Sequence, residues 1–389
     1  CNIEYNVAHK NGGFAYSLKS FHAMIDILDT RMISNNAIHG SGGGIWIHNL
    51  SLSNGLLLNV MSSIFNDNTA GIHGGIMYIN DNNIDIRISN SSMVSNKALL
   101  GDGGCISSRS YINMNMTYND ITSNTAGNNG GCMSFDDNIE INIINNIIKN
   151  NTASISGGVI YANHSSRMPN LIDSQVLYNT ALNGNCGAFC TSLSIIRKCN
   201  IEYNVAHKNG GFAYSLKSFH AMIDILDTRM ISNNAIHGSG GGIWIHNLSL
   251  SNGLLLNVMS SIFNDNTAGI HGGIMYINDN NIDIRISNSS MVSNKALLGD
   301  GGCISSRSYI NMNMTYNDIT SNTAGNNGGC MSFDDNINIQ MYSNTFNNNI
   351  ASVSGGVGYF GNAILLESNK SLFHNNSCLV GNGLSLIHI

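Results

Sequence analysis

The sequence has little charge, almost no proline and no long hydrophobic run. Charged residues make up 10% of its 389 positions, where about 25% is usual for a soluble domain. The net charge is −6 and no basic cluster is present, which makes nucleic acid and anionic membranes poor partners. The apolar runs are well below the ~18 to 20 residues of a membrane helix. We therefore expect no nucleic-acid partner and no transmembrane segment within this chain.

Glycine and asparagine are in excess. The 42 glycines amount to about 11% of the chain, where ~7% is usual. An amphipathic helix would need apolar residues three and four positions apart over several turns, and no such pattern occurs. Segments such as residues 83–98, NIDIRISNSSMVSNKA, alternate at a period of two and contain many β-branched and polar residues. These patterns predict an all-β protein.

Residues 1–139 and 199–337 are identical at every position. Identity over this length indicates a recent duplication or an artefact of assembly, and it requires the same local structure in both copies. The chain begins with Cys1 and shows no signal peptide. We expect it to be a fragment or a processed chain that forms one continuous domain over residues 1–389.

A shorter repeat runs through the whole chain. Its consensus is apolar-x-x-Asn-x-Ala, a short variable turn, Gly-Gly and an apolar segment, as in FNDNTAGIHGGIMYI from Phe65 to Ile79. The asparagines recur at intervals of 25 to 33 residues, which average about 28. The fourteen positions are Asn6, Asn35, Asn68, Asn96, Asn124, Asn151, Asn179, Asn204, Asn233, Asn266, Asn294, Asn322, Asn349 and Asn376.

A repeat of this length predicts a solenoid or another array. Glycine pairs would interrupt helices, and propeller blades need ~40 residues or more. Short strands joined by glycine turns fit the coils of a parallel β-helix with three strands per coil. The sequence therefore predicts a parallel β-helix solenoid of about fourteen coils, each of ~28 residues.

The coil geometry explains the conserved spacing of the repeat within this chain. Successive coils stack at ~4.8 Å, so equivalent residues form a ladder along the stack. Asparagines at an inward turn can hydrogen-bond to one another and to the backbone, which leaves no buried polar group without a partner. The alanine is small because the turn is tight, and the glycine pair allows a positive φ or a close backbone approach. We assign the fourteen asparagines this structural role.

The pairing of the two short motifs resembles the chlamydial polymorphic membrane proteins and related surface proteins of bacteria and protists. FNDN at Phe65, FNNN at Phe346 and FHNN at Phe373 carry the first motif, and GGIM at Gly74 and GGVI at Gly157 carry the second. The repeats cover residues 1–389. The resemblance implies a right-handed parallel β-helix of the pectin-lyase-like fold, extracellular or at the cell surface or outer membrane, and often linked to adhesion.

Parallel β-helices also include polysaccharide lyases and glycoside hydrolases, which need carboxylates that converge on one face. Adjacent acids, as at Asp136 and Asp137, could form such a pair, but a solvated turn after Phe135 is the simpler interpretation. The hydrolase motifs Asn-Thr-Asp, Asp-Asp, Gly-His-Gly and Arg-Ile-Lys are absent as a set. We therefore assign no catalytic residue. The acidic candidates are Asp102, Asp136, Asp137, Asp300, Asp334 and Asp335.

Metal and cofactor motifs are also absent from the sequence. The 13 histidines include neither His-x-His nor His-Glu-x-x-His, and we interpret His39 and His73 as exposed polar residues of the variable turn. GSGGG at Gly40 lacks the Lys-Ser/Thr of a phosphate loop. Cys186 and Cys190 have no partners at zinc-site spacing. We expect no metal and no cofactor.

The remaining cysteines include two stacked pairs, Cys105 with Cys132 and Cys303 with Cys330. Each of these residues follows Gly-Gly directly, in neighbouring coils. Stacked neighbours fall within the Cα range of a disulfide, although their parallel side-chain vectors are poorly disposed for one. The alternative is that these cysteines are small, buried apolar residues.

We expect a non-enzymatic cell-surface or secreted β-helical repeat protein, an adhesin or binding rod. Faces with Ser, Thr and Asn at repeated spacing suit weak, multivalent contact with a glycan or protein on another surface. The alternative is a polysaccharide lyase or glycoside hydrolase of the same fold, or a degenerate relative, and it rests on fold analogy. Ice or mineral binding lacks the expected Thr-x-Thr rows. Three or more carboxylates in one groove would favour the enzyme.

Overall fold

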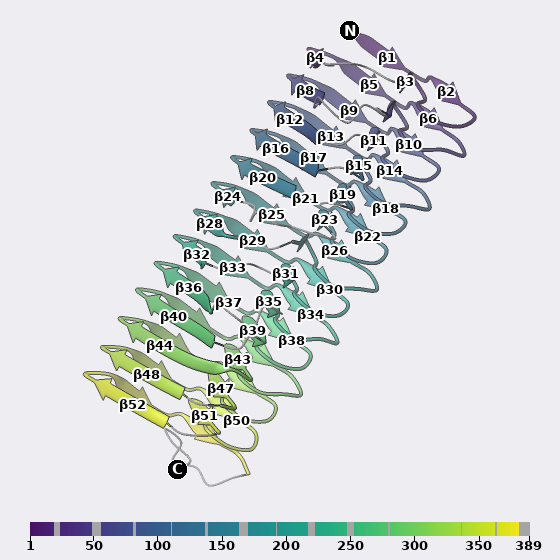
Figure 1. Ribbon diagram of the computed structural model, residues 1–389. Helices are drawn as coiled ribbons and strands as arrows, with labels where there is room; N and C mark the ends of the chain where they lie inside the picture. The colour runs from purple at the N-terminus through teal and green to yellow at the C-terminus, as the bar shows by residue number, and fades with distance from the viewer. Residues whose placement is uncertain are drawn as a thin grey trace. The chain divides into compact units, whose positions relative to one another are not determined.

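Each coil consists of four short strands separated by tight corners (Figure 1). The strand pairings between described residues of this computed structural model are parallel, and these residues contain no helix. The structure describes residues 1–18, 24–48, 56–80, 83–109, 111–136, 139–162, 170–191, 193–216, 222–246, 253–278, 281–335, 337–361 and 364–380. The predicted all-β parallel solenoid with coils of about 28 residues is confirmed.

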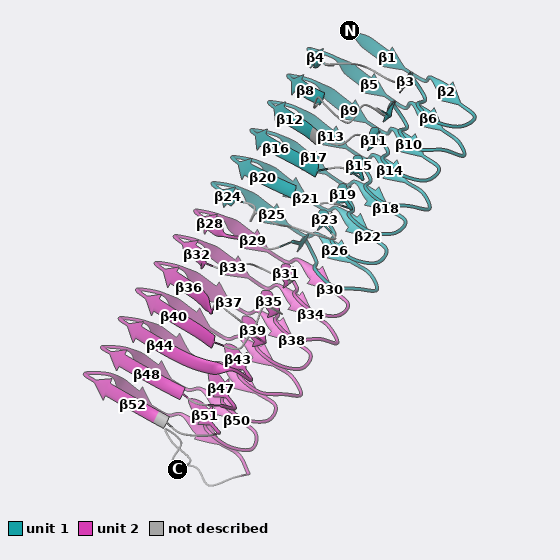
Figure 2. Ribbon diagram, in the orientation of Figure 1, with its two compact units in different colours: residues 1–192 teal, residues 193–389 magenta. Residues whose placement is uncertain are grey.

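The chain forms two compact units, Cys1–Ser192 and Leu193–Ile389 (Figure 2). Each unit contains strands of four parallel sheets, which we call A, B, C and D in the order in which a coil visits them. Because each unit is described by itself, one continuous domain over residues 1–389 stays a prediction.

In the first unit, sheets A and B contain the shortest strands, of three and two residues. Sheet A consists of β1 (Asn2–Glu4), β5 (Arg31–Ile33), β9 (Ile64–Asn66), β13 (Ser92–Val94), β17 (Asp120–Thr122), β21 (Ile147–Lys149) and β25 (Gln175–Leu177). Sheet B consists of β2 (Val7–Ala8), β6 (Asn36–Ala37), β10 (Thr69–Ala70), β14 (Lys97–Ala98), β18 (Thr125–Ala126), β22 (Thr152–Ala153) and β26 (Thr180–Ala181).

Sheet D of the first unit has the longest strands, of up to seven residues, and sheet C has strands of two to four residues. Sheet C consists of β3 (Ala15–Leu18), β7 (Ile45–His48), β11 (Met77–Asn80), β15 (Ile106–Ser108), β19 (Met133–Phe135), β23 (Ile160–Ala162) and β27 (Phe189–Cys190). Sheet D consists of β4 (Met24–Leu28), β8 (Leu56–Met61), β12 (Asn83–Ser89), β16 (Tyr111–Thr117), β20 (Ile139–Ile144) and β24 (Asn170–Ile172).

The second unit repeats this order. Its sheet A consists of β29 (Asn200–Glu202), β33 (Arg229–Ile231), β37 (Ile262–Asn264), β41 (Ser290–Val292), β45 (Asp318–Thr320), β49 (Thr345–Asn347) and β53 (Leu372–His374). Its sheet B consists of β30 (Val205–Ala206), β34 (Asn234–Ala235), β38 (Thr267–Ala268), β42 (Lys295–Ala296), β46 (Thr323–Ala324), β50 (Ile350–Ala351) and β54 (Ser377–Cys378).

The longer strands of the second unit again belong to sheets C and D. Sheet C consists of β31 (Ala213–Leu216), β35 (Ile243–His246), β39 (Met275–Asn278), β43 (Ile304–Ser306), β47 (Met331–Phe333) and β51 (Gly358–Phe360). Sheet D consists of β28 (Ile195–Arg197), β32 (Met222–Leu226), β36 (Leu254–Met259), β40 (Asn281–Ser287), β44 (Tyr309–Thr315), β48 (Ile337–Tyr342) and β52 (Ile364–Asn369).

The alternating segments of the sequence form sheet D, because successive side chains of a strand point to opposite faces. In β16, Ile112, Met114 and Met116 are fully buried, whereas Asn113 and Asn115 lie on the outer face. Sheet A contributes one interior residue per coil, such as Phe65. The core of each unit is therefore a stack of aliphatic, methionine and phenylalanine layers inside the coils.

The prediction of three strands per coil is wrong, because the corner at the ladder asparagine separates two strands. Sheet A ends before Asn96, and the two residues that follow Asn96 form the separate strand β14. A two-residue strand shows no alternation, so the periodicity of the sequence cannot reveal it.

The corners use glycine and other residues at positive φ. The first glycine of each pair is left-handed, as at Gly130 with φ of 64°, and Cys186 takes this conformation with φ of 63°. A Cβ on Gly131 would collide with the carbonyl oxygen of Gly158 in the next coil. The residue directly before each ladder asparagine is also left-handed but is not glycine, as at Ser123 with φ of 59°. The repeat in the sequence predicts a positive φ for the glycine pairs alone.

Candidate functional site

Twelve of the fourteen ladder asparagines are buried inside the units, and Asn6 and Asn376 are half-buried. The Asn124 Oδ1 accepts hydrogen bonds from the Asn96 backbone N–H at 2.9 Å and from the Asn96 Nδ2 at 3.0 Å. The Asn124 Nδ2 donates to the Met93 carbonyl at 2.9 Å and to the Asn151 Oδ1 at 2.9 Å. Asn96, Asn124 and Asn151 have no exposed surface. The amides of this column are therefore used in hydrogen bonds within the protein and are not accessible to a ligand.

A second buried polar column, which was not predicted from the sequence, lies at the corner between sheets D and A. Its residues lie five positions before the ladder asparagines, and each backbone N–H donates to the next side chain along the stack. Ser63 donates to the Ser91 Oγ at 3.1 Å, Ser91 to the Asn119 Oδ1 at 3.0 Å and Asn119 to the Asn146 Oδ1 at 2.9 Å. Because serine, threonine, asparagine and cysteine all occur at this position, the sequence shows no constant residue type there. The constant five-residue offset is the signal that could have found it.

Two of the predicted acidic candidates lie on the side of the first unit formed by sheet C. Asp102 precedes the Gly-Gly corner of its coil, and its Oδ2 lies 3.3 Å from the His73 Nδ1 of the preceding coil. The Asp102 Oδ1 accepts from the Asn129 backbone N–H at 2.9 Å and from the Asn128 Nδ2 at 2.8 Å. Asp102 therefore links three successive coils.

The environment of Asp102 favours its charged form. Burial alone would raise its pKa, but the hydrogen bonds with His73 and Asn129 outweigh burial and hold the pKa of Asp102 below its usual range. The Asp102 backbone nitrogen also lies 3.0 Å from the His73 Nδ1, which accepts from this N–H when the ring proton is on Nε2 and donates to the Asp102 carboxylate when Nδ1 is protonated. His73 is only 23% exposed, so interpreting it as an exposed polar residue is wrong. His39 is exposed, and its ring lies 4.8 Å from that of His9.

Asp136 lies at the end of β19 on the same side of the unit. Its Oδ2 is 3.6 Å from the Arg109 Nε, and the side chain is 55% exposed. Such an exposed ion pair contributes little to stability. Asp137 lies outside the described residues. The second unit repeats the cluster, with His271 3.2 Å from Asp300 and Arg307 3.8 Å from Asp334.

The two carboxylates of the second unit influence one another. The hydrogen bonds from His271 and Asn327 outweigh burial and lower the pKa of Asp300. Burial and the charge of Asp300 raise the pKa of Asp334, against the opposing charge of Arg307. Asp335 is also exposed. In the described parts of the chain, no group of three or more His, Cys, Asp or Glu residues could hold a metal ion.

Tyrosines flank these carboxylates on the outer face of sheet C. Tyr16, Trp46 and Tyr78 are in register, and the rings of Tyr16 and Trp46 stack with centroids 4.4 Å apart. The column continues after Tyr78 through two serines to Tyr161. Burial raises the pKa of Tyr78, Arg109 opposes this rise and Asp136 adds to it. The stacked rings cover one another, since Trp46 is only 9% exposed.

In each unit, the outer face of sheet D carries one column of polar side chains. We define the amide face of the first unit as the outward, register-matched column Asp26, Asn59, Arg87, Asn115, Asn142 and Asn170. The Asn142 Nδ2 donates to the Asn115 Oδ1 at 3.0 Å, and the Asn170 Nδ2 donates to the Asn142 Oδ1 at 2.9 Å. These contacts hold the amides in one orientation at the spacing of the strands.

The amide face of the second unit is similar but not identical. We define it as the equivalent column Asp224, Asn257, Arg285, Asn313, Gln340 and Glu367. The Asn257 Nδ2 donates to the Asp224 Oδ1 at 2.8 Å. Beside this column, the Asn311 Nδ2 donates to the Asp283 Oδ1 at 2.8 Å. Both units therefore offer a row of pre-oriented donors and acceptors.

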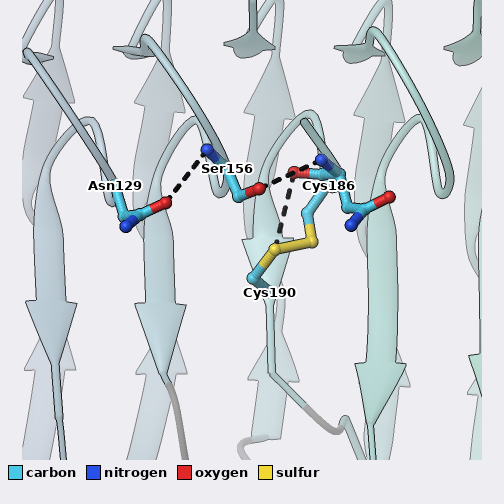
Figure 3. The surroundings of a disulfide bond; sticks show 5 residues. Asn129, Ser156, Cys186 and Cys190 are labelled. Carbon is cyan, nitrogen blue, oxygen red and sulfur yellow. Dashed lines mark hydrogen bonds between the residues drawn. A yellow bond between two sulfur atoms is a disulfide. The ribbon is translucent and has the colours of Figure 1, made fainter. Parts of the chain in front are cut away.

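One disulfide joins Cys186 and Cys190 at a Gly-Gly corner of the first unit (Figure 3). Its two Cα atoms are 5.3 Å apart, and the Cys190 Sγ lies 3.5 Å from the Asn185 carbonyl oxygen. Figure 3 also shows Ser156, whose Oγ accepts from the Asn185 backbone N–H at 3.1 Å. The sequence analysis noted the two cysteines but did not pair them.

Comparison with known proteins assigns neither a family nor a function to the chain. No protein-family model matches the chain, and neither the comparison with curated proteins nor that with solved structures gives a match. The described residues include no helix that is long and apolar enough to span a membrane.

Proposed function

We propose that this protein is a non-enzymatic β-helical repeat protein, secreted or displayed at a cell surface, that binds a glycan or protein on another surface. The amide faces of the two units carry this proposal. Their donors and acceptors are held in place before any ligand arrives, which lowers the ordering cost of binding. A second copy of the same chemistry in one chain suits multivalent attachment, where weak contacts add up.

The chemistry of the amide face favours a neutral polysaccharide as ligand. Asparagine side chains at ~4.8 Å spacing match the rows of hydroxyl groups along an extended sugar chain. Each amide that is used once in the column keeps further donor or acceptor capacity. Arg87 lies between acidic and amide neighbours rather than in a basic cluster, so polyanion binding is less favoured.

The motif resemblance to the chlamydial polymorphic membrane proteins supports a location outside the cell or at its surface, and an adhesive role. In this proposal the solenoid is right-handed and acts as a rigid support for its outer faces. The interior ladders account for the rigidity, since their asparagines are buried with their hydrogen bonds made.

Retention on insoluble cellulose, chitin and mannan tests the proposal. We expect the unaltered chain to bind at least one of them. The variant Asn115→Ala/Asn142→Ala/Asn313→Ala/Gln340→Ala should lose most of this retention, because it removes amides from both faces. Asn183→Ala is a matched control, since Asn183 is an exposed asparagine that donates to Ser154 away from sheet D. Absence of retention on all three polymers, or equal retention by the face variant, would contradict a neutral polysaccharide as the ligand of the amide faces.

The alternative, a carbohydrate-active enzyme, is supported by the opposed pKa directions of Asp300 and Asp334, since an acid and a base need different pKa values. One observation weighs against it, because Asp300 is engaged with His271 and with the Asn326 amide. Incubation with pectin, polygalacturonate and alginate distinguishes the two. Release of reducing or unsaturated ends, lost in Asp136→Asn/Asp334→Asn, would establish the enzyme.

A further inference from the structure

Two buried cysteines in neighbouring coils of the first unit hold their sulfur atoms together. Cys105 and Cys132 each follow a Gly-Gly corner, and neither side chain has exposed surface. The Cys105 backbone N–H donates to the Cys132 carbonyl at 2.7 Å, so the two residues are in register. Their Sγ atoms are 3.0 Å apart, closer than an ordinary non-bonded contact between two sulfurs.

The second unit contains the same arrangement at Cys303 and Cys330. Both residues are fully buried, and the Cys303 N–H donates to the Cys330 carbonyl at 2.8 Å. The neighbouring positions of the same interior column are apolar, as at Ile76. Each cysteine pair therefore lies in an apolar interior with only its partner as a reactive neighbour.

We propose that each pair is a site of covalent modification, an inter-coil disulfide that forms when the chain folds in an oxidising environment. The oxidant is a small-molecule disulfide. One thiolate attacks it and releases one small thiol, and the second cysteine thiolate then displaces the other small thiol. The two cysteine sulfurs lose two electrons in total, the small disulfide gains them, and the two cysteine protons end on the two released thiols.

The burial of the pair sets when this chemistry can occur. Burial, followed by the hydrogen bond between the two cysteines, raises the pKa of Cys105 well above its ordinary value, and the pKa of Cys303 shifts in the same direction for the same reasons. Since the thiolate is the reactive form, exchange is slow once the coil has closed. The bond therefore forms while the coils are still assembling, and afterwards small reductants do not reach it.

This disulfide would differ in effect from the one at the corner. The bond between Cys186 and Cys190 closes a sequence separation of 4 residues. A bond between Cys105 and Cys132 would close a separation of 27 residues, which is one whole coil. The entropic model of disulfide stabilisation gives the larger effect to the longer loop.

Peptide mapping of the refolded chain tests the proposal. The reduced, unfolded chain is refolded across a series of glutathione redox ratios, unfolded without reductant, alkylated with iodoacetamide and digested with trypsin. We expect residues 98–109 to be linked to residues 110–149 in a species that lacks two hydrogens and carries no alkyl group. Because residues 98–109 and 296–307 are identical, Cys303→Ala/Cys330→Ala is used to assign the link to the first unit.

The corner disulfide is the control for oxidation in the same digest. If Cys105 and Cys132 are fully alkylated at every ratio that oxidises Cys186 and Cys190, or if no ratio links them, the proposal is overturned and the thiols are only packed side by side. As a second measurement, Cys105→Ala/Cys132→Ala/Cys303→Ala/Cys330→Ala keeps Cys186 and Cys190, so on refolding with glutathione disulfide its melting temperature should rise only by the small amount that this short-loop disulfide contributes. The parent should melt several degrees higher after oxidative refolding.

Discussion

At the scale of single residues, the structure depends on polar side chains that have no contact with water. An asparagine in the column of Asn96, Asn124 and Asn151 accepts two hydrogen bonds and donates two. Removing one such amide leaves the neighbouring groups that donated to it and accepted from it without partners. Each unsatisfied buried group costs about 1–3 kcal/mol.

We predict that Asn124→Ala lowers the free energy of unfolding by about 3 kcal/mol or more. Urea denaturation followed by circular dichroism measures the change. Asn115→Ala is the matched control, since its side chain is on the outer amide face, and surface changes of this kind stay within about 0.5 kcal/mol. Equal losses in the two variants would show that an interior amide contributes no more to stability than an amide on the surface.

A second prediction concerns the pH dependence set by Asp102 and Asp300. Their pKa values are lower in the folded state than in the unfolded chain, where an aspartate has a pKa of about 3.9. Their contribution to stability is therefore present above about pH 4 and lost as the pH falls through the folded pKa values. The variant Asp102→Asn/Asp300→Asn should lose part of the acid destabilisation seen between neutral pH and about pH 3. Melting temperatures of parent and variant that fall in parallel over this range would refute the assignment.

The residues that could be predicted from the sequence are those at positions where every repeat has the same residue type. Asn124 and its equivalents recur with the same neighbours, so their burial follows from the repeat. Ser91 and Asn119 occupy one structural position with different side chains, so in the sequence only their constant offset from the ladder asparagines indicates their equivalence. The contact between His73 and Asp102 joins residues of neighbouring coils, and no local pattern indicates it.

At the scale of elements, the corners determine how closely successive coils approach. The glycine pair combines a left-handed residue with one whose Cα faces the next coil's backbone, as Gly130 and Gly131 show. The sequence indicated this requirement correctly. It did not indicate the non-glycine left-handed residues such as Ser123, because serine occurs in many other conformations as well.

We predict that Gly131→Ala destabilises the first unit by about 3 kcal/mol or more, because the colliding atom is backbone and cannot rotate away. One kcal/mol corresponds to about 2–4 °C in a domain of this size, so the melting temperature should fall by several degrees. Thr125→Ala in the same coil is the control, since Thr125 is only half-buried. A variant that melts with the parent would show that the corner can widen.

At the scale of the whole molecule, stability is a sum over coils, because each coil contacts chiefly its neighbours. The register of β14 on β18 places Lys97 opposite Thr125. Removing residues 97–124 therefore joins Asn96 to Thr125 at an equivalent point of the path and leaves every remaining strand a partner.

We predict that this deletion keeps the β-rich circular dichroism spectrum and cooperative melting, with a modest loss of stability. Removing residues 97–110 instead takes out part of a coil and shifts later side chains away from their ladders, so it should abolish cooperative melting. If both deletions melt alike, the coils are not the independent building blocks described above.

The same modularity bears on how such a gene can change. The offset between the identical segments carries Asn6 onto Asn204, from one ladder position to another. A duplication of this size inserts only complete coils, so the order of strands and corners is preserved. It also inserts only complete codons, so the reading frame of the gene is preserved. Slippage or unequal recombination between these stretches of DNA would therefore give longer and shorter alleles that still fold, and selection could act on length alone.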